Sequence, residues 1–199
     1  MSPARRAGWI SSLLLVTSLS AAACDGDGAG PGGGGGAGGG GGGGSGAEDP
    51  FAAPLGCASG EQWNPSGQAG VDMNPGKACL ACHAQEGKGP MLHVAGTVYP
   101  LGHETDLCHG IDGTSPEFSD VKVEITDANG QVHTLKIYPT GNFGREQAGF
   151  AYPYTARVVS SKGERVMNGP QEIGDCNLCH TAAGGGNGSD APGRIVMPL

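Results

Sequence analysis

The middle of the chain alternates between apolar and polar positions. In VKVEIT, at 121–126, apolar residues occupy every second place, and Lys, Glu and Thr occupy the places between them. A period of two puts the two sets on opposite faces of a β-strand, with one face against a core. HVAGTVYP at 93–100 and YTARVV at 154–159 are also rich in β-branched residues, a composition that favours strands.

Tight turns separate these segments. DANG at 127–130 and SSKG at 160–163 have the Asn and Gly residues typical of hairpin turns. About five to seven short strands fit into this part of the chain. We therefore predict a mainly β fold, a small antiparallel β-sandwich over 94–166. Two loop-rich or short helical segments, 47–93 and 167–199, flank it.

The N-terminal part of the chain has the features of an export signal. Two arginines, an apolar run and then small residues precede Cys24, which is typical of a secretory signal over 1–23. The apolar run is too short to span a bilayer as a mature helix. Cys24 as a lipid-modified N-terminus resembles a bacterial lipoprotein, and plain cleavage near Ala23 is the alternative. The glycine-rich segment 24–46 then predicts a flexible tether.

The remaining residues, 47–199, suit one domain with an acidic surface. The full chain has 11 Lys and Arg against 19 Asp and Glu, a formal net charge of −8, and Arg5 and Arg6 leave with the signal. This acidity argues against nucleic acid and against anionic lipid headgroups as partners. It suits attraction to a basic redox partner protein, although solvated surface acidity is the simpler explanation.

Four of the seven cysteines fall into two copies of Cys-x-x-Cys-His, the attachment signature of c-type haem. Two intervening residues let one turn of backbone present both thiols to the two vinyl groups of a porphyrin. The His that follows is then held under the iron as an axial ligand. We therefore predict two covalent haem c groups, attached and ligated by Cys79, Cys82 and His83 in the first motif and by Cys176, Cys179 and His180 in the second.

Two other kinds of site share parts of this pattern. Zinc often binds through Cys-x-x-Cys pairs, so a mixed site could take Cys and His from both motifs. A thioredoxin-like redox pair has the same spacing but needs a βαβ context, which Pro- and Gly-rich flanks do not favour. Haem is preferred because both copies include the immediate His. It would also supply buried apolar surface to a domain poor in large apolar residues.

Cys57 and Cys108 lie outside both motifs. We expect a disulfide between them, because an exported chain meets an oxidising compartment. Such a bond would tie the N-terminal segment to the middle of the domain and close a long loop. Ligation of iron by one of these cysteines, or a thiol left unpaired, is the alternative.

Parts of the chain resemble known proteins. The run from AGTVY through ITDANG and TGNF to YPYTARV resembles the prealbumin-like sandwich of carboxypeptidase regulatory-like domains. The region from Cys57 to Pro198 resembles a group of bacterial exported lipoproteins in which such a sandwich is flanked by Cys-x-x-Cys-His segments. This resemblance implies a haem-carrying protein of the periplasm or cell surface and no defined reaction. It depends on MNPGKACLACH, AGTVYP, GDCNLCH and APGRI, at 73–83, 95–100, 174–180 and 191–195.

If an iron has no open coordination position, the side of the haem opposite the motif His needs a second ligand. His103 is the first candidate, because it lies in the irregular segment LGHETDLCHG, where the backbone is freer to point a side chain at a metal. Met73 and Met167 shortly precede the two motifs, and a thioether sulfur is a known axial ligand. Each Met could instead be an apolar side chain that packs against the porphyrin without ligating the iron. His93 and His133 lie in predicted strands and are expected to be ordinary surface or packed residues.

Two classes of function follow from these predictions. The first is an electron carrier without catalytic residues, whose partners are redox proteins, including other multihaem cytochromes, and which reaches the membrane through its lipid. The alternative is a haem enzyme of the peroxidase or reductase kind with one open iron site. That chemistry needs an acid, base or cation beside the iron, for which Glu104, Asp106, Arg145 and Arg165 are candidates. A zinc-binding structural lipoprotein and a haem-based sensor are less favoured.

Overall fold

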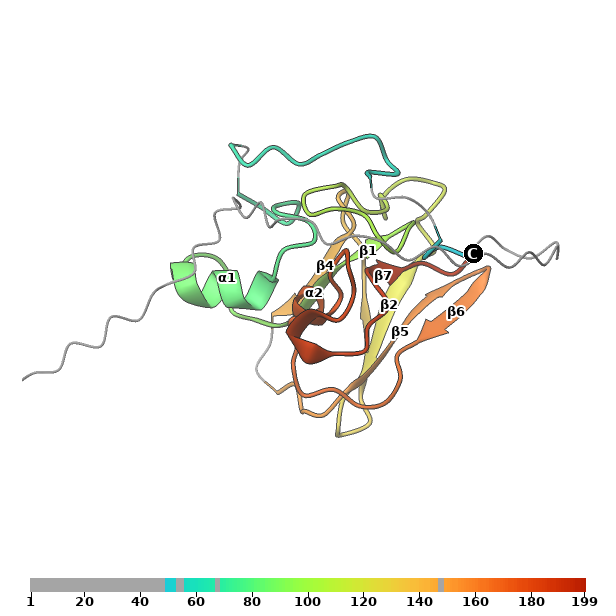
Figure 1. The fold of residues 1–199 in the computed structure, drawn as a ribbon. Helices are drawn as coiled ribbons and strands as arrows, with labels where there is room; N and C mark the ends of the chain where they lie inside the picture. The colour runs from blue at the N-terminus through green and yellow to red at the C-terminus, as the bar shows by residue number, and fades with distance from the viewer. Residues whose placement is uncertain (1–48, 53–55, 67–68, 147–148) are drawn as a thin grey trace, which may run out of the picture. The chain divides into compact units, whose positions relative to one another are not determined.

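The structure is a computed structural model that describes residues 49–52, 56–66, 69–146 and 149–199. The predicted signal over 1–23, the lipidated Cys24 and the tether 24–46 lie outside the described residues. The described part is mainly strand, with two sheets and few helices, as predicted (Figure 1). None of its helices has the length and apolar character needed to cross a membrane.

Two sheets account for the strands of the described residues. One has the order β4-β1-β7 and the other the order β3-β2-β5-β6. Both predicted hairpins are present, since β2 pairs antiparallel with β3 across DANG and β5 pairs antiparallel with β6 across SSKG. The strands are β1 (Leu92–Tyr99), β2 (Lys122–Thr126), β3 (Val132–Leu135), β4 (Asn142–Glu146), β5 (Thr155–Ser160), β6 (Gly163–Val166) and β7 (Ile195–Val196).

The two sheets share one apolar core. On β2 the predicted alternation is seen, because Val123 and Ile125 are buried while the residues between them are only partly buried. Residues of β1, Val94 and Val98, join the same cluster from the other sheet, as does Phe143 of β4. Two sheets with their apolar faces on a common core are compatible with a small β-sandwich.

Strand β1 does not alternate between buried and exposed residues. Its six residues from Val94 to Tyr99 are all buried, because one face meets the core and the two motif-bearing helices contact the same strand. Gly96 is needed for this close approach: a β-carbon there would lie 2.8 Å from Cζ of Phe143 and 2.9 Å from Cβ of Cys176. Strand β1 is therefore the shared support of both motifs.

One strand pair differs from the antiparallel prediction. Strand β7 comes from the C-terminal segment and pairs parallel with β1, with Val98 opposite Ile195 and Tyr99 opposite Val196. A parallel pair needs a long crossover connection. The chain between β1 and β7, which includes β2 to β6, supplies it, and the second Cys-x-x-Cys-His motif lies near the end of that connection.

Candidate functional site

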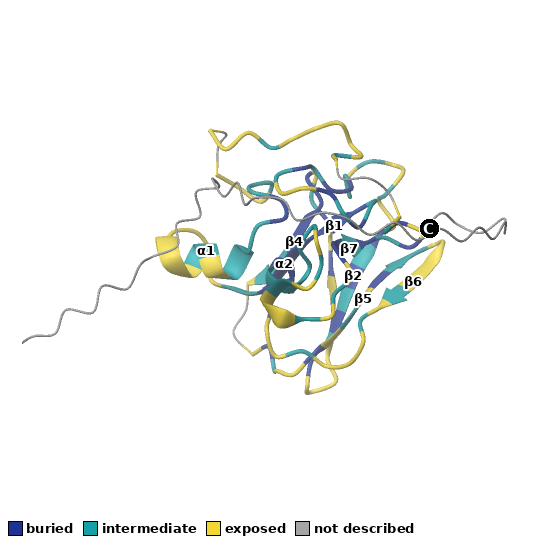
Figure 2. Ribbon diagram, in the orientation of Figure 1, coloured by how far each residue is buried: buried dark blue, intermediate teal, exposed yellow. Residues whose placement is uncertain are grey.

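The first motif lies on helix α1 (Cys79–Glu86), which contacts β1 and projects to one side of the sheets (Figure 1). None of its residues is buried, as Figure 2 shows. The helix ends at Gly87, in the left-handed conformation with φ of 61°, where glycine is favoured. The chain then turns back, so that Nδ1 of His83 lies 2.9 Å from the carbonyl oxygen of Pro90.

The second motif forms a single helical turn, α2 (Cys176–Cys179), directly followed by His180. The backbone N–H of His180 donates to the carbonyl of Cys176 at 2.9 Å. Its imidazole Nδ1 lies 3.0 Å from the carbonyl oxygen of Gly193. Desolvation lowers the pKa of His180, so its ring is neutral at neutral pH, the form that binds metals.

The two motif histidines thus have the same hydrogen-bonding arrangement. A carbonyl oxygen can only accept, so Nδ1 of both His83 and His180 carries a proton, and in the neutral form of each ring Nε2 has the lone pair. In metal sites this bond fixes the tautomer and the ring orientation of a His ligand. Both rings are therefore prepared to bind a metal through Nε2.

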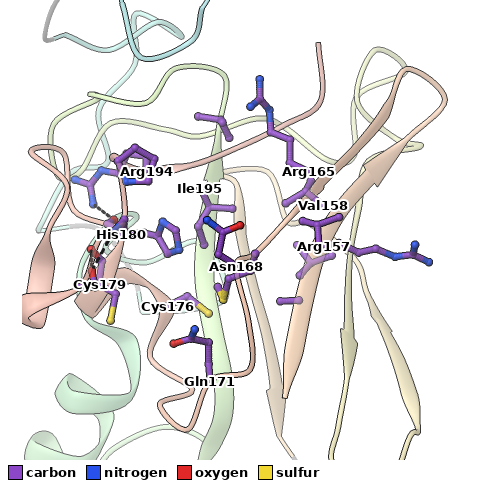
Figure 3. Close-up of a pocket in the computed structure, with 18 of the residues that line it drawn as sticks. Arg157, Val158, Arg165, Asn168, Gln171, Cys176, Cys179, His180, Arg194 and Ile195 are labelled. Carbon is purple, nitrogen blue, oxygen red and sulfur yellow. Dashed lines mark hydrogen bonds between the residues drawn. The ribbon is translucent and has the colours of Figure 1, made fainter. Parts of the chain in front are cut away.

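A cavity of about 270 Å³ opens beside the second motif. Figure 3 shows the sulfur of Cys176 and the ring of His180 on one side of it, facing Asn168 and Gln171. Apolar side chains of β2, β5, β6 and β7 make up much of the wall. Ligand cavities are typically mostly apolar with a few convergent polar groups, which matches this one. Its apolar lining includes Val123, Ile125, Val158, Val166 and Ile195.

The predicted distal ligands lie in different places. Met167 lines the same cavity as His180, and its backbone N–H donates to the carbonyl of Ala156 at 3.0 Å. The carbonyl of Met73 accepts from Nδ2 of Asn142 at 2.8 Å, and Met73 is not among the described residues that line this cavity. The structure therefore brings one of the two methionines to the second motif.

His103 is the third predicted distal ligand, and it lies in a different place from the two methionines. Its ring packs edge-on against Phe51, with 5.9 Å between the ring centroids, and its Nδ1 lies 2.6 Å from the carbonyl oxygen of Ala182. The loop around it is held by a disulfide between Cys57 and Cys108. His103 has an Nε2 available by the same argument as the motif histidines, and its role as a distal ligand stays a prediction.

The two motifs are joined by direct hydrogen bonds that the sequence did not reveal. Helix α1 follows Ala78, whose methyl group cannot cap it. Instead the carboxylate of Asp175, from the second motif segment, accepts from the backbone N–H groups of Cys79 and Ala81, both at 3.0 Å. Asn177 then donates to the carbonyl of Lys77 at 2.9 Å. The start of α1 is thus capped by a residue far away in the sequence.

A buried polar network continues beneath these contacts. The Thr97 hydroxyl donates to Oδ1 of Asn142 at 2.8 Å and accepts from the N–H of Gly76 at 2.9 Å and from Nδ2 of Asn177 at 3.0 Å. Its backbone N–H donates to Oδ1 of Asn177 at 3.1 Å. A satisfied buried network of this kind fixes the groups that it joins.

Arg194 is a second residue that links the motif segments. It is only 1% exposed and donates to the carbonyls of Glu104 and Gly76, both at 2.9 Å, and of His180, at 3.3 Å (Figure 3). It also binds the carboxylate of Asp106. Its guanidinium therefore connects the segment before α1, the loop around 104–106 and the end of the second motif.

The candidate acid, base and cation residues are mostly engaged elsewhere. The carboxylate of Glu104 is buried and accepts from the N–H of Ala58 at 2.9 Å. Asp106 pairs with Arg194 and with Lys77. Arg145 lies on β4 opposite Val94. Of these candidates, Arg165 alone lines the cavity beside His180, and its Nε donates to the carbonyl of Met197 at 2.9 Å.

The first thiol of each motif does not have the lowered pKa of a redox nucleophile. Desolvation raises the pKa of Cys79 to about 12, and the Asp175 carboxylate adds to that shift. Desolvation likewise raises the pKa of Cys176 to about 12. Reactive Cys-x-x-Cys pairs have lowered thiol pKa values. In the described residues, no three His, Cys, Asp or Glu side chains gather as a metal site.

Comparisons with family models, with curated proteins and with solved structures give no match for this chain. The residues of this chain are compatible with a haem at each motif, because both histidines can offer Nε2 to a metal and the second motif opens on a cavity whose lining is partly apolar.

Proposed function

We propose that this protein is a di-haem c-type cytochrome that carries electrons in the periplasm or at the cell surface, anchored there by a lipid on Cys24. The observation that carries the proposal is the shared geometry of His83 and His180. Each follows a Cys-x-x-Cys pair, and each has Nδ1 held by a backbone carbonyl, of Pro90 and of Gly193. Two copies of this arrangement in one chain match covalent haem attachment.

The chain's residues have distinct tasks in this function. When bound, haem supplies a reversible one-electron change between ferric and ferrous iron. The paired cysteines, Cys79 with Cys82 and Cys176 with Cys179, would hold the porphyrin through thioethers, formed by adding each S–H group across a vinyl C=C bond. The carbonyls of Pro90 and Gly193 hold the histidine rings still, which keeps rearrangement on electron transfer small. The apolar cavity wall excludes water around the second motif.

The fold and the partners complete the proposal. The two sheets are a prealbumin-like sandwich, and the segments 47–93 and 167–199 are its haem-carrying flanks, whose motif helices α1 and α2 contact β1. The net charge of −8 favours a redox partner with a basic surface, such as another multihaem cytochrome, because opposite charge speeds encounter. No substrate pocket is needed for this task.

The test is a haem count on protein made in a host with cytochrome c maturation. A pyridine haemochrome assay with intact mass should give two covalent haems per chain. The paired variants Cys79→Ala/Cys82→Ala and Cys176→Ala/Cys179→Ala should each keep one. The same chain made without the maturation machinery is the control and should be colourless. Colourless protein from the competent host, with all four thiols unmodified, would overturn the proposal and favour zinc.

One observation keeps a haem enzyme as the second candidate. Arg165 lines the cavity that His180 faces, and a cation beside an open iron is what a peroxidase or reductase needs. Carbon monoxide binding to the reduced protein separates the two functions. Negligible binding supports closed irons and electron transfer, whereas rapid binding at one haem per chain supports the enzyme.

A further inference from the structure

The two haem-attachment segments form one hydrogen-bonded unit. Asp175 directly precedes Cys176, and its carboxylate accepts from the N–H groups of Cys79 and Ala81 at 3.0 Å each. A helix N-terminus carries a partial positive charge, so the carboxylate both caps α1 and neutralises that end. The first turn of one motif is therefore positioned by the residue that introduces the other.

A second residue, Asn177, connects the second motif to a haem-attachment sulfur of the first. Asn177 lies between the two cysteines of the second motif, and its Nδ2 is 3.8 Å from Sγ of Cys79. This sulfur is an atom that a c-type haem would bond. Asn177 is itself buried and tied to the carbonyl of Lys77. The attachment edge of the first haem would thus lie within contact of the turn that carries the second.

Strand β1 supports this arrangement through close contacts with both motif segments. The backbone N–H of Ala95 donates to the carbonyl of Gly174 at 3.0 Å, and Ala95 forms an isolated parallel bridge with Asp175. A β-carbon at Gly174 would collide with the carbonyl oxygen of His93 at 1.7 Å, so the second motif segment lies directly on β1. Helix α1 contacts the same strand. Both motif segments therefore contact the same strand, β1.

We infer that Asp175 and Asn177 are positioning residues that hold the two haem-attachment segments together, so that haems attached there would be kept close enough to interact electronically. This inference rests on the proposed function. With haem bound at each motif, such an arrangement would allow one-electron exchange between the two groups, in which one iron would be oxidised as the other is reduced and no bond or proton would change.

The wild-type holoprotein gives the first test, by circular dichroism in the Soret band. Two strong chromophores held close together couple and give a signal with one positive and one negative lobe. Distant haems give the sum of two independent signals. The single-haem variants of both motifs supply that sum for comparison. A two-lobed wild-type signal that the sum does not reproduce is expected, and a purely additive spectrum would overturn the inference.

The roles of the positioning residues are tested by substitution at Asp175. Asp175→Ala removes both acceptors and should at least halve the two-lobed amplitude while two haems remain bound. Asp175→Asn keeps one carbonyl oxygen and should retain more of it. Asp112→Asn is the matched control, because its carboxylate also accepts a backbone N–H, of Thr114 at 2.9 Å, in a loop away from the motifs. Unchanged amplitude in both Asp175 variants would contradict the assigned role.

The two proposals fail in different ways. Fewer than two covalent haems in the wild-type protein contradict the proposed function, whatever the circular dichroism shows. Two haems with an additive Soret spectrum leave the cytochrome intact and remove the close pairing. If Asp175→Ala does not mature, Asp175→Asn and the wild-type spectrum still decide. A redox titration in which reduction of one haem shifts the midpoint of the other is the independent check.

Discussion

Gly89 packs against the ring of His83. A β-carbon at this position would lie 3.2 Å from Cε1 and 3.4 Å from Nδ1 of the imidazole. Gly89 also has a φ of 82°, in the left-handed region. The turn that brings the Pro90 carbonyl to Nδ1 thus leaves little room for a side chain beside the ring, and a β-carbon there would require the imidazole to shift by a few tenths of an ångström. The position of the first motif histidine is therefore sensitive to substitution of this glycine.

Gly89→Ala should therefore disturb the first haem. The new methyl group pushes the His83 ring or breaks its bond to Pro90, so we expect altered EPR g-values and a shifted midpoint potential for one haem, with the other unchanged. Gly87→Ala is the control, because Gly87 also has a positive φ, of 61°, but nothing lies within 4 Å of its β-carbon position. Both variants should lose about 1–2 kcal/mol of stability to backbone strain. Equal spectral effects in the two would contradict the prediction.

Met167, and not Met73, should be the methionine that ligates the iron of the second haem. It lines the cavity that the His180 ring faces, and Met73 does not. Met167→Leu keeps the apolar volume but removes the sulfur, so the weak near-infrared band of Met-ligated ferric haem should disappear and the midpoint potential of one haem should fall. The reduced variant should also bind carbon monoxide at one haem per chain. Met73→Leu is the control, and loss of the band there but not in Met167→Leu would reverse the assignment.

Much of the β structure could be predicted from the sequence, because it follows from local signals. The period of two in β2 and the Asn and Gly residues of DANG gave the hairpin that the structure shows. Strand β7 could not be predicted in this way. It is two residues long, Ile195 and Val196, and it forms only because the crossover returns the chain to β1. A short run of this kind has no periodicity to recognise.

The candidate site was predictable where chemistry depends on neighbouring residues and not where it depends on distant ones. The cysteines and His of each motif stand together in the sequence, so their spacing identifies them. Asp175 is a typical N-cap residue by type, yet the helix it caps begins at Cys79, far away in the chain. Arg194 is almost fully buried, although arginine is usually exposed. Such long-range partners leave no local pattern.

Arg194 should be among the most important residues for stability. Arg194→Met would leave its carbonyl acceptors, on Gly76 and Glu104, without their buried donor. Removing one partner of a buried charged contact costs about 3–5 kcal/mol, measured here by urea unfolding of the holoprotein. Arg157→Met is the control, because Arg157 pairs with glutamates on the exposed face of β5 and surface ion pairs contribute little. Comparable losses in the two variants would contradict a special role for Arg194.

The β2–β3 hairpin should weaken in acid through Asp127. Its carboxylate accepts from Nε2 of His133 at 3.0 Å and from the N–H groups of Asn129 and Gln131, and the hydrogen bond from His133 lowers the pKa of Asp127. A lowered folded-state pKa stabilises the protein above the unfolded carboxyl pKa of about 3.9. That contribution is lost as the pH falls from there through the folded-state pKa.

Asp127→Asn should therefore lower the free energy of unfolding at pH 6, and its difference from the wild type should shrink as the pH falls below about 4. Urea unfolding of the holoprotein at a series of pH values measures both effects. Glu117→Gln, an exposed carboxyl in the loop before β2, removes the same charge and should leave the unfolding free energy almost unchanged across this range. A constant difference between wild type and Asp127→Asn down to pH 2 would show that the lost stability comes from packing and not from the ionised carboxylate.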